Sequence, residues 1–322
     1  MKKLSPWFIL SLLYAINITS SAQGFTVSGT KLLDDNGNEF VIRGMNMPFI
    51  WFPKQTYKSL DNIAELGVNS VRIVWQTKGT ATQLDSVIQR CIDLKMIPMV
   101  ELHDVTGSRS TDKLLETVSY YLKPDILAII KKYRKYLLVN LANEWGNHTV
   151  NSAYWKKAYQ RAVDTLRAAG IKTTLVIDAP GWGQNITPIL EKGNELLQAD
   201  PQKNILFSVH IYGSWNDSLS IENKLQEAHD KNLPLIVGEF GYNYKDGNNN
   251  LGCKVNHRKI LSTCQKLNYG YMPWSWTGNN EENAWLDIAD FKDWKTLTRW
   301  GNEVFDSDNG IRKTAKRASV FE

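Results

Sequence analysis

Short apolar segments alternate with amphipathic segments along most of this chain, and this alternation restricts the possible folds more than any other feature. Helical segments include residues 82–95, which begin with a capping pattern at Thr82 and Asp85, and residues 152–170, which end at Gly170, a typical helix C-cap. The apolar segments are near-continuous, as expected for parallel strands that are buried on both faces. Eight of them read as strands, over residues 40–46, 70–75, 97–104, 136–143, 173–179, 205–212, 233–240 and 269–276.

Eight strand–helix units in roughly 280 residues predict an α/β protein folded as a (β/α)8 TIM barrel. The alternative for this pattern is an open, doubly wound sheet, but no glycine-rich phosphate-binding turn follows the first strand. Residues 25–40 precede the barrel and read as a short β-hairpin that turns at Asn36-Gly37. The sequence contains neither a linker nor a low-complexity segment, so we expect residues 23–322 to form a single domain.

The first residues have the features of an export signal. Lys2 and Lys3 precede a short apolar run, FILSLLYAI, and small residues at 20–22 supply a cleavage site. The run is too short to remain as a membrane anchor. We therefore expect residues 1–22 to be a signal peptide. The mature protein is then expected to be a secreted monomer, periplasmic or extracellular, with no membrane association.

Charge and cysteine content narrow the possible partners. The formal net charge of +5 is too small and too evenly spread to indicate nucleic acid binding. Cys91 lies on the apolar face of a predicted helix and is expected to be a buried free thiol. Cys253 and Cys264 either stay free or join a loop to the following helix. No cysteine–histidine spacing is typical of a metal site, so we expect neither a metal nor a cofactor.

Two of the predicted strands end in a glutamate, although burial of a charge is costly. Glu144 follows VNLAN at the end of the fourth strand, and Glu239 follows LPLIVG at the end of the seventh. Function in a TIM barrel lies at the C-terminal ends of its strands, so the fold would bring both carboxylates to one mouth. Such a pair is the machinery of glycoside hydrolysis, and a separation of roughly 5–5.5 Å predicts retention of anomeric configuration.

Neighbouring residues have expected roles in this chemistry. Arg72 and Tyr212 are expected to keep Glu239 ionised through charge and hydrogen bonding. Trp145 follows Glu144 directly and is expected to keep that carboxyl protonated by partial desolvation. Asn143, just before Glu144, is placed to bond a sugar hydroxyl.

Seven motifs extend the interpretation: NLANEWG, LIVGEFG, GVNSVRIVW, VELHDVTGS, VIDAPGWGQN, FSVHIY and PWSWTGN. From about Gly24 to the C-terminus, in register with the predicted strands, the chain resembles glycoside hydrolase family 5, and within it the bacterial endo-β-1,4-mannanases. The resemblance implies that Glu144 is the acid/base and Glu239 the nucleophile of a retaining enzyme acting on β-mannan or a related plant polysaccharide. It also implies that Trp274 is the platform under the cleaved sugar. The residues around that sugar would be Arg72, His103, Asn143, His210, Tyr212 and Trp274.

Two departures from the mannanase pattern keep a second substrate open. Residues 46–54, NMPFIWFPK, lack the histidines that this branch carries in the corresponding loop, and Thr277 stands where lysine is expected. The alternative substrate is cellulose, mixed-linkage glucan or xylan. Three tryptophans lie in loops predicted at the barrel mouth, where their flat apolar faces are expected to bind sugar rings: Trp51, Trp182 and Trp215.

Two other classes of protein fit less well. A non-catalytic carbohydrate-binding barrel would be favoured if either glutamate were replaced, and both are present. A metal-dependent barrel hydrolase would carry an HxH pattern on its first strand, where this chain has VIRGMN. His103 and His210 therefore read as sugar contacts or as structural histidines.

Overall fold

The computed structural model describes residues 24–322, and the predicted signal peptide, residues 1–22, lies outside this range. Eight parallel strands form one sheet in which the spatial order follows the chain order. A parallel bridge between Arg43 and Tyr271 brings the last strand back to the first and closes the ring. The strands are β3 (Gly44–Met47), β4 (Ser70–Trp75), β5 (Ile97–Leu102), β6 (Leu138–Asn140), β7 (Leu175–Asp178), β8 (Ile205–Ile211), β9 (Leu235–Phe240) and β10 (Gly270–Tyr271).

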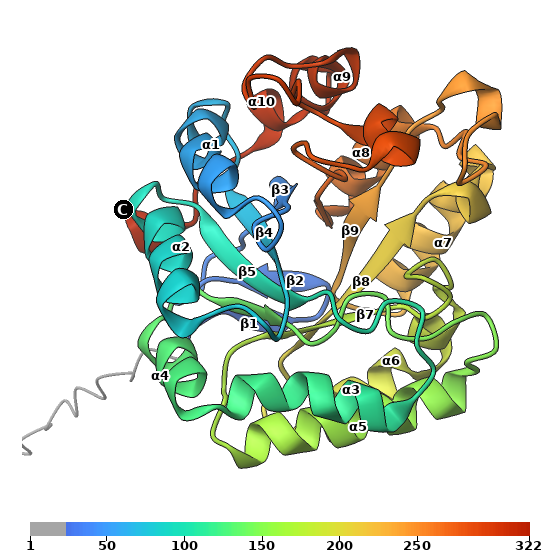
Figure 1. The fold of residues 1–322 in the computed structure, drawn as a ribbon. Helices are drawn as coiled ribbons and strands as arrows, with labels where there is room; N and C mark the ends of the chain where they lie inside the picture. The colour runs from blue at the N-terminus through green and yellow to red at the C-terminus, as the bar shows by residue number, and fades with distance from the viewer. Residues whose placement is uncertain (1–23) are drawn as a thin grey trace, which may run out of the picture.

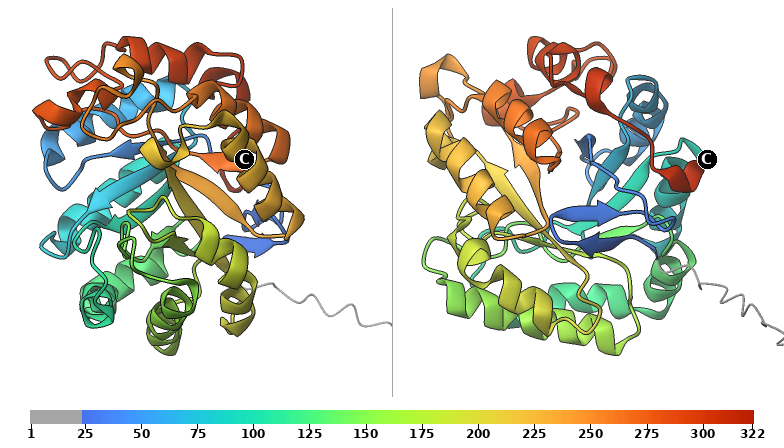
Figure 2. Two further views of the ribbon diagram at one scale, coloured as in Figure 1. Left: turned by 90° about the vertical axis from the view of Figure 1, so that its right-hand side faces the viewer. Right: turned by 180° about the vertical axis from the view of Figure 1, so that it is seen from behind.

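Helices surround this ring, as Figures 1 and 2 show from three sides. The predicted (β/α)8 TIM barrel is therefore confirmed. Within residues 24–322, none of the helices has the length and apolar character needed to cross a bilayer. The helices are α1 (Pro53–Glu65), α2 (Ala81–Asp93), α3 (Thr111–Ser119), α4 (Pro124–Lys132), α5 (Ser152–Ala168), α6 (Thr187–Ala199), α7 (Ser218–Asp230), α8 (His257–Leu267), α9 (Arg299–Asp306) and α10 (Ile311–Thr314), with single 3₁₀ turns η1 (Tyr120–Leu122), η2 (Gly213–Trp215), η3 (Lys245–Gly247), η4 (Glu281–Leu286) and η5 (Ser319–Phe321).

The helix ends follow local hydrogen-bonding rules, with one correction. Helix α5 ends before Gly170, which has a φ of +82° as expected of a C-cap glycine. Helix α2 begins earlier than predicted, because Thr80 is its N-cap and its hydroxyl accepts the amide hydrogen of Gln83 at 3.3 Å. The expected capping pattern at Thr82 therefore lies inside the helix.

The predicted N-terminal hairpin is present, but its ladder turns at a different place. Strand β1 (Thr26–Ser28) pairs antiparallel with β2 (Lys31–Leu33), so the connection is Gly29-Thr30. Asn36-Gly37 forms a second turn, in which Gly37 adopts a φ of +80° and Leu33 bridges to Glu39. The hairpin lies across one end of the barrel, in front of the strands in the right-hand view of Figure 2, and Phe25 packs with strand residues that include Ile97.

All three cysteines are buried and free. Cys91 is fully buried on α2, as predicted for an apolar helix face, and burial raises the pKa of its thiol. Cys253 and Cys264 do not form the disulfide that was one of the two alternatives. The Cys253 thiol lies 3.4 Å from the carbonyl oxygen of Tyr242 instead.

Candidate active site

Glu144 lies in the loop after β6, and hydrogen bonds with the end of β7 and with the loop after β5 fix its backbone. Its φ of +48° is left-handed, which an L-residue adopts only when the surroundings enforce it. The amide N–H of Glu144 donates to Asp178 Oδ2 at 3.0 Å, and its carbonyl oxygen accepts from the amide of Gly107 at 2.9 Å. The loop after β7 also contacts this segment, because the carbonyl oxygen of Gly146 accepts hydrogen bonds from the amides of Gly181 and Trp182 at 2.8 and 3.1 Å.

Glu239 belongs to β9 and faces Glu144 across the barrel mouth. His210, on β8, lies between them: its Nδ1 is 2.7 Å from Glu144 Oε1 and 3.5 Å from Glu239 Oε2. One ligating atom from each of these three residues lies within 4.8 Å of the other two. One oxygen of Glu144 and one of Glu239 thus lie no more than 4.8 Å apart, which is shorter than the roughly 6.5–9.5 Å of an inverting pair and favours retention.

Arg72 and Tyr212 contact Glu239 as the sequence predicted, and burial of Glu239 opposes the effect of the Arg72 charge on its pKa. Arg72 Nη1 donates to Glu239 Oε1 at 2.7 Å, and the Tyr212 hydroxyl donates to Oε2 at 3.0 Å. Burial raises the pKa of Glu239 above its ordinary value, and the charges of His210 and Arg72 oppose that rise without cancelling it. Arg72 thus acts in the expected direction, toward ionisation, and the larger opposing effect of burial was not foreseen from the sequence.

The guanidinium of Arg72 organises the polar interior beneath the glutamates. It is fully buried, and its remaining N–H groups donate to Asn140 at 3.0 Å, Asn46 at 2.9 Å and Asn143 at 2.7 Å. Asn143 in turn donates to Thr106 Oγ1 at 2.9 Å. Its carboxamide is therefore oriented by the protein before any sugar binds, with one N–H left to reach a hydroxyl.

The carboxylates around His210 favour its cationic form. Burial lowers its pKa, but the negative charges of Glu239, Asp178 and Glu144 outweigh burial and raise it to about 9. The three side chains Glu144, His210 and Glu239 have the spacing of a metal site. Arg72 places a fixed positive charge against Glu239, and His210 adds another when it is protonated, so the contacts disfavour a metal cation and favour proton transfer.

Three aromatic rings form a row beside Glu239. The imidazole of His103 stacks on Trp274 with centroids 5.9 Å apart, and it makes an edge-to-face contact with Trp51 at 5.2 Å. His103 Nδ1 lies 2.8 Å from Glu101 Oε1. Burial lowers the pKa of His103, but Glu101 outweighs it and the net shift is upward. Sequence reasoning missed Glu101, whose one signal was a carboxylate inside the apolar strand β5.

The loop tryptophans separate into two kinds. Trp51 and Trp182 expose 42% and 39% of their surface, so both can present a ring to a ligand as predicted. Trp215 cannot, because it is completely buried, donates its indole N–H to the carbonyl of Gln184 at 2.8 Å and lies under Lys224. The predicted role of Trp215 as a sugar platform is therefore wrong.

Trp145 does not desolvate Glu144 in the way the sequence predicted. Its ring is buried against Tyr154 and Tyr159, and its indole N–H donates to the carbonyl of Ser110 at 2.9 Å. The hydrogen-bonding partner of the Glu144 carboxyl is His210.

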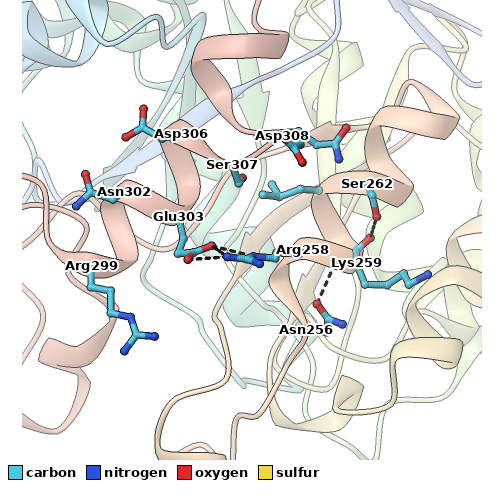
Figure 3. Close-up of a pocket in the computed structure, with 12 residues that line it drawn as sticks. Asn256, Arg258, Lys259, Ser262, Arg299, Asn302, Glu303, Asp306, Ser307 and Asp308 are labelled. Atoms are coloured by element: carbon cyan, nitrogen blue, oxygen red, sulfur yellow. Dashed lines mark hydrogen bonds and ion pairs between the residues drawn. The ribbon is translucent and has the colours of Figure 1, made fainter.

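A surface cavity of about 950 Å³ lies between α8 and α9, away from the glutamates (Figure 3). Its lining is polar and includes a paired charge, since Arg258 donates from two guanidinium nitrogens to the Glu303 carboxylate at 2.8 to 3.0 Å. None of the residues described above lines it. This groove on the outside of the barrel offers no pair of facing carboxylates, so the chemistry is placed at the mouth.

Comparison with known proteins agrees with this geometry. A mannan endo-1,4-β-mannosidase of Cellvibrio japonicus is 33% identical over 311 residues, which cover 94% of this chain and 70% of that protein. Another, of Salipaludibacillus agaradhaerens, is 35% identical over 306 residues, covering 92% and 96%. The solved β-mannanase from Thermomonospora fusca is 32% identical over 93% of this chain and 99% of its own, with a TM-score of 0.85, and its mannohexaose complex gives 0.84. The family model described as cellulase (glycosyl hydrolase family 5) matches residues 33–280, and the chain therefore belongs to glycoside hydrolase family 5.

Proposed function

We propose that this protein is an endo-acting, retaining β-mannanase that hydrolyses β-1,4-mannosidic bonds in mannan and glucomannan. The observation that carries the proposal is the close approach of Glu144 and Glu239. One carboxylate oxygen of each and one ring nitrogen of His210 all lie within 4.8 Å of one another. The choice of mannan rests on the relatives, which are named as mannan-cleaving enzymes and include one solved with mannohexaose.

In the first step, a carboxylate oxygen of Glu239 attacks the anomeric carbon while Glu144 gives its proton to the leaving glycosidic oxygen. The carbon–oxygen bond of the glycoside breaks, and a glycosyl ester of Glu239 forms. In the second step, Glu144 takes a proton from water, the water oxygen attacks the same carbon, and Glu239 leaves as a carboxylate. Two inversions at one carbon give net retention.

The neighbours of each glutamate suit these steps. Arg72 and Tyr212 bind the two oxygens of Glu239, so they stabilise the carboxylate when it leaves the sugar. His210 donates to Glu144 once that residue has lost its proton, and thereby stabilises the base required for the second step. The stacked pair Trp274 and His103 offers a flat apolar surface for the sugar ring undergoing attack.

Export and assembly state complete the proposal. The basic start, short apolar run and small residues before position 23 support secretion, and we propose that the mature chain meets polysaccharide outside the cytoplasm as a monomer. Mass spectrometry of protein recovered from the medium and periplasm tests this part: a mature chain beginning near residue 23 is the expected result, and retention of the full N-terminus in the cytoplasm contradicts it.

The activity is tested with purified mannan, glucomannan, cellulose and xylan in parallel. We expect reducing sugars from the first two, with a rapid fall in viscosity that marks internal cleavage. Products should appear first as the β-anomer by NMR. Cleavage of glucan alone would overturn the mannan assignment, and binding without any sugar release would indicate a carbohydrate-binding barrel.

Variants separate the two glutamates. Glu239→Ala and Glu144→Ala should each lower turnover on mannan by roughly 10³-fold or more. With an aryl mannobioside that has a good leaving group, Glu144→Ala still forms the ester, and added azide should restore turnover and yield a β-mannosyl azide. The matched control is Glu195→Ala, a surface glutamate paired with Lys192 on α6, which should leave turnover unchanged.

A further inference from the structure

A chain of hydrogen bonds in the loop after β10 fixes the orientation of the Trp274 indole. The indole Nε1 of Trp274 donates to Asn279 Oδ1 at 2.8 Å. Because an indole N–H only donates, Asn279 must turn its carboxamide oxygen, and not its NH₂ group, toward the ring. One face of the ring is stacked on His103 with an interplanar angle of 21°. The hydrogen bond sets the rotation of the ring within that stack.

Asp287 decides which end of the Asn279 carboxamide faces the indole. Asn279 Nδ2 donates to Asp287 Oδ1 at 2.7 Å and to Ser275 Oγ at 3.1 Å, and the Asn279 backbone amide also donates to Asp287 Oδ1, at 3.2 Å. A carboxylate only accepts hydrogen bonds. A reversed carboxamide would place its oxygen against the Asp287 oxygen and its NH₂ against the indole N–H, so both contacts would become repulsive.

Asp287 is itself held by the helix layer, with only 8% of its surface exposed. Its amide donates to the carbonyl of Ala284 at 3.1 Å, and its carbonyl oxygen accepts the Thr298 hydroxyl at 2.7 Å. Thr298 is the N-cap of α9. Burial raises the pKa of the Asp287 carboxyl, and the hydrogen bonds from Asn279 oppose that rise. The hydrogen bonds therefore connect the start of α9, through Asp287 and Asn279, to the indole of Trp274.

We propose that Asn279 and Asp287 are positioning residues, which hold Trp274 at the angle required beneath the sugar that is cleaved. The proposal rests on the proposed function of Trp274 as that platform. Neither residue is hydrogen-bonded to Glu144, Glu239 or His210 in the described part of the chain, so their effect on the reaction passes through the indole. A displaced platform leaves the anomeric carbon out of line with Glu239, and a misplacement of about 1 Å can cost about 10²-fold in rate.

The test is a double-mutant cycle on kcat/KM for mannohexaose, using the full mature protein. We expect Asn279→Ala to lower kcat/KM by about 10- to 100-fold, mainly through kcat. In the Trp274→Phe background the same change should cost less than about twofold, because phenylalanine has no N–H for Asn279 to orient. Equal losses in both backgrounds would mean that Asn279 supports the loop in general, and would overturn the proposal.

A second measurement does not depend on catalysis. In ¹⁵N–¹H NMR spectra, the Trp274 indole signal is identified by its disappearance in Trp274→Phe. Asn279→Ala should move this signal and speed its hydrogen exchange, since the acceptor is lost. An unmoved signal overturns the positioning role even if mannan is cleaved, whereas a moved signal in a protein inactive on every polysaccharide contradicts the proposed function alone.

Asp287→Asn keeps the shape of the side chain and serves if Asn279→Ala does not fold. Its carboxamide can both donate and accept, so both orientations of Asn279 become possible. We expect two positions of the Trp274 indole signal, or one averaged signal, and a fall in kcat/KM smaller than that of Asn279→Ala. A wild-type spectrum together with wild-type kinetics would overturn the role of Asp287. Urea unfolding of each variant verifies that the fold is intact.

Discussion

Replacing Arg72 with methionine tests how far the polar interior of the barrel depends on one cation. The guanidinium is fully buried and lies 2.7 Å from Glu239 Oε1 and 3.6 Å from Asp178 Oδ2. Methionine fills a similar volume but provides neither charge nor donors. In the variant, two buried carboxylates lose the charge of Arg72 and retain His210 as a neighbour, and three asparagine side chains lose a donor: Asn46, Asn140 and Asn143.

The expected loss of stability follows from the burial of the pair. Removing one partner of a buried ion pair costs about 3–5 kcal/mol, because the other charge stays buried without compensation. Native domains are stable by about 5–15 kcal/mol, so Arg72→Met is expected to fold with a much reduced margin. The loss should shrink as the pH falls through the pKa of Glu239, since protonation removes the uncompensated charge from the variant.

Urea unfolding at pH 7 and pH 5, followed by tryptophan fluorescence and circular dichroism, measures this loss. The matched control is Arg90→Met on the outer face of α2, where the partner Asp61 is half exposed and solvent screens the pair. That pair should contribute no more than about 1 kcal/mol. If Arg72→Met and Arg90→Met lowered the free energy of unfolding equally at pH 7, the reasoning about the buried cation would be refuted.

Two further predictions concern His210 and the loop tryptophans. The pKa of His210 is about 9 when folded against an ordinary 6.5, so its stabilisation is complete below pH 6.5 and is lost as the pH rises through 9. This stabilisation is on the order of 3 kcal/mol. It would be contradicted if the free energy of unfolding of the wild type stayed level from pH 7 to 9. It would also be contradicted if the free energy of unfolding of His210→Gln declined as much as that of the wild type over this range. Trp182→Ala should raise KM for long mannans several-fold with little effect on unfolding, whereas Trp215→Ala should lower the free energy of unfolding by about 3–5 kcal/mol. A Trp215→Ala protein as stable as the wild type would show that this ring is not packed as described.

The regularity of the barrel explains why its strands and glutamates were predictable from the sequence. Burial on both faces makes each strand a continuous apolar run, and parallel strands place their C-terminal ends at one mouth. Strand ends were less accurate: β6 stops at Asn140, but the apolar pattern continues to Ala142 because that loop is buried too. Strand β10 stops at Tyr271, shortly before Pro273, which cannot donate to a ladder.

Side-chain direction within loops was not predictable. Trp215 and Trp182 both follow strands of the barrel, and only the carbonyl of Gln184, reached from another loop, draws Trp215 inward. Glu101 was missed because its partner His103 is two residues away on the same face of the chain, where it reads as part of the strand. Asn279 and Asp287 were missed because their hydrogen bonds depend on how one loop folds back on itself.

The backbone contacts of Glu144 also bear on how the protein can be redesigned. Gly107, Gly146 and the turn that carries Trp182 are bonded to the acid's own peptide segment, so these loops move as a single piece. Altering the Trp182 turn to admit a different polysaccharide would shift the proton donor as well. The loop at 48–52 is anchored separately, through Ile50 to Val74. Engineered changes of substrate range are therefore best made in that loop, where they leave the backbone of the proton donor in place.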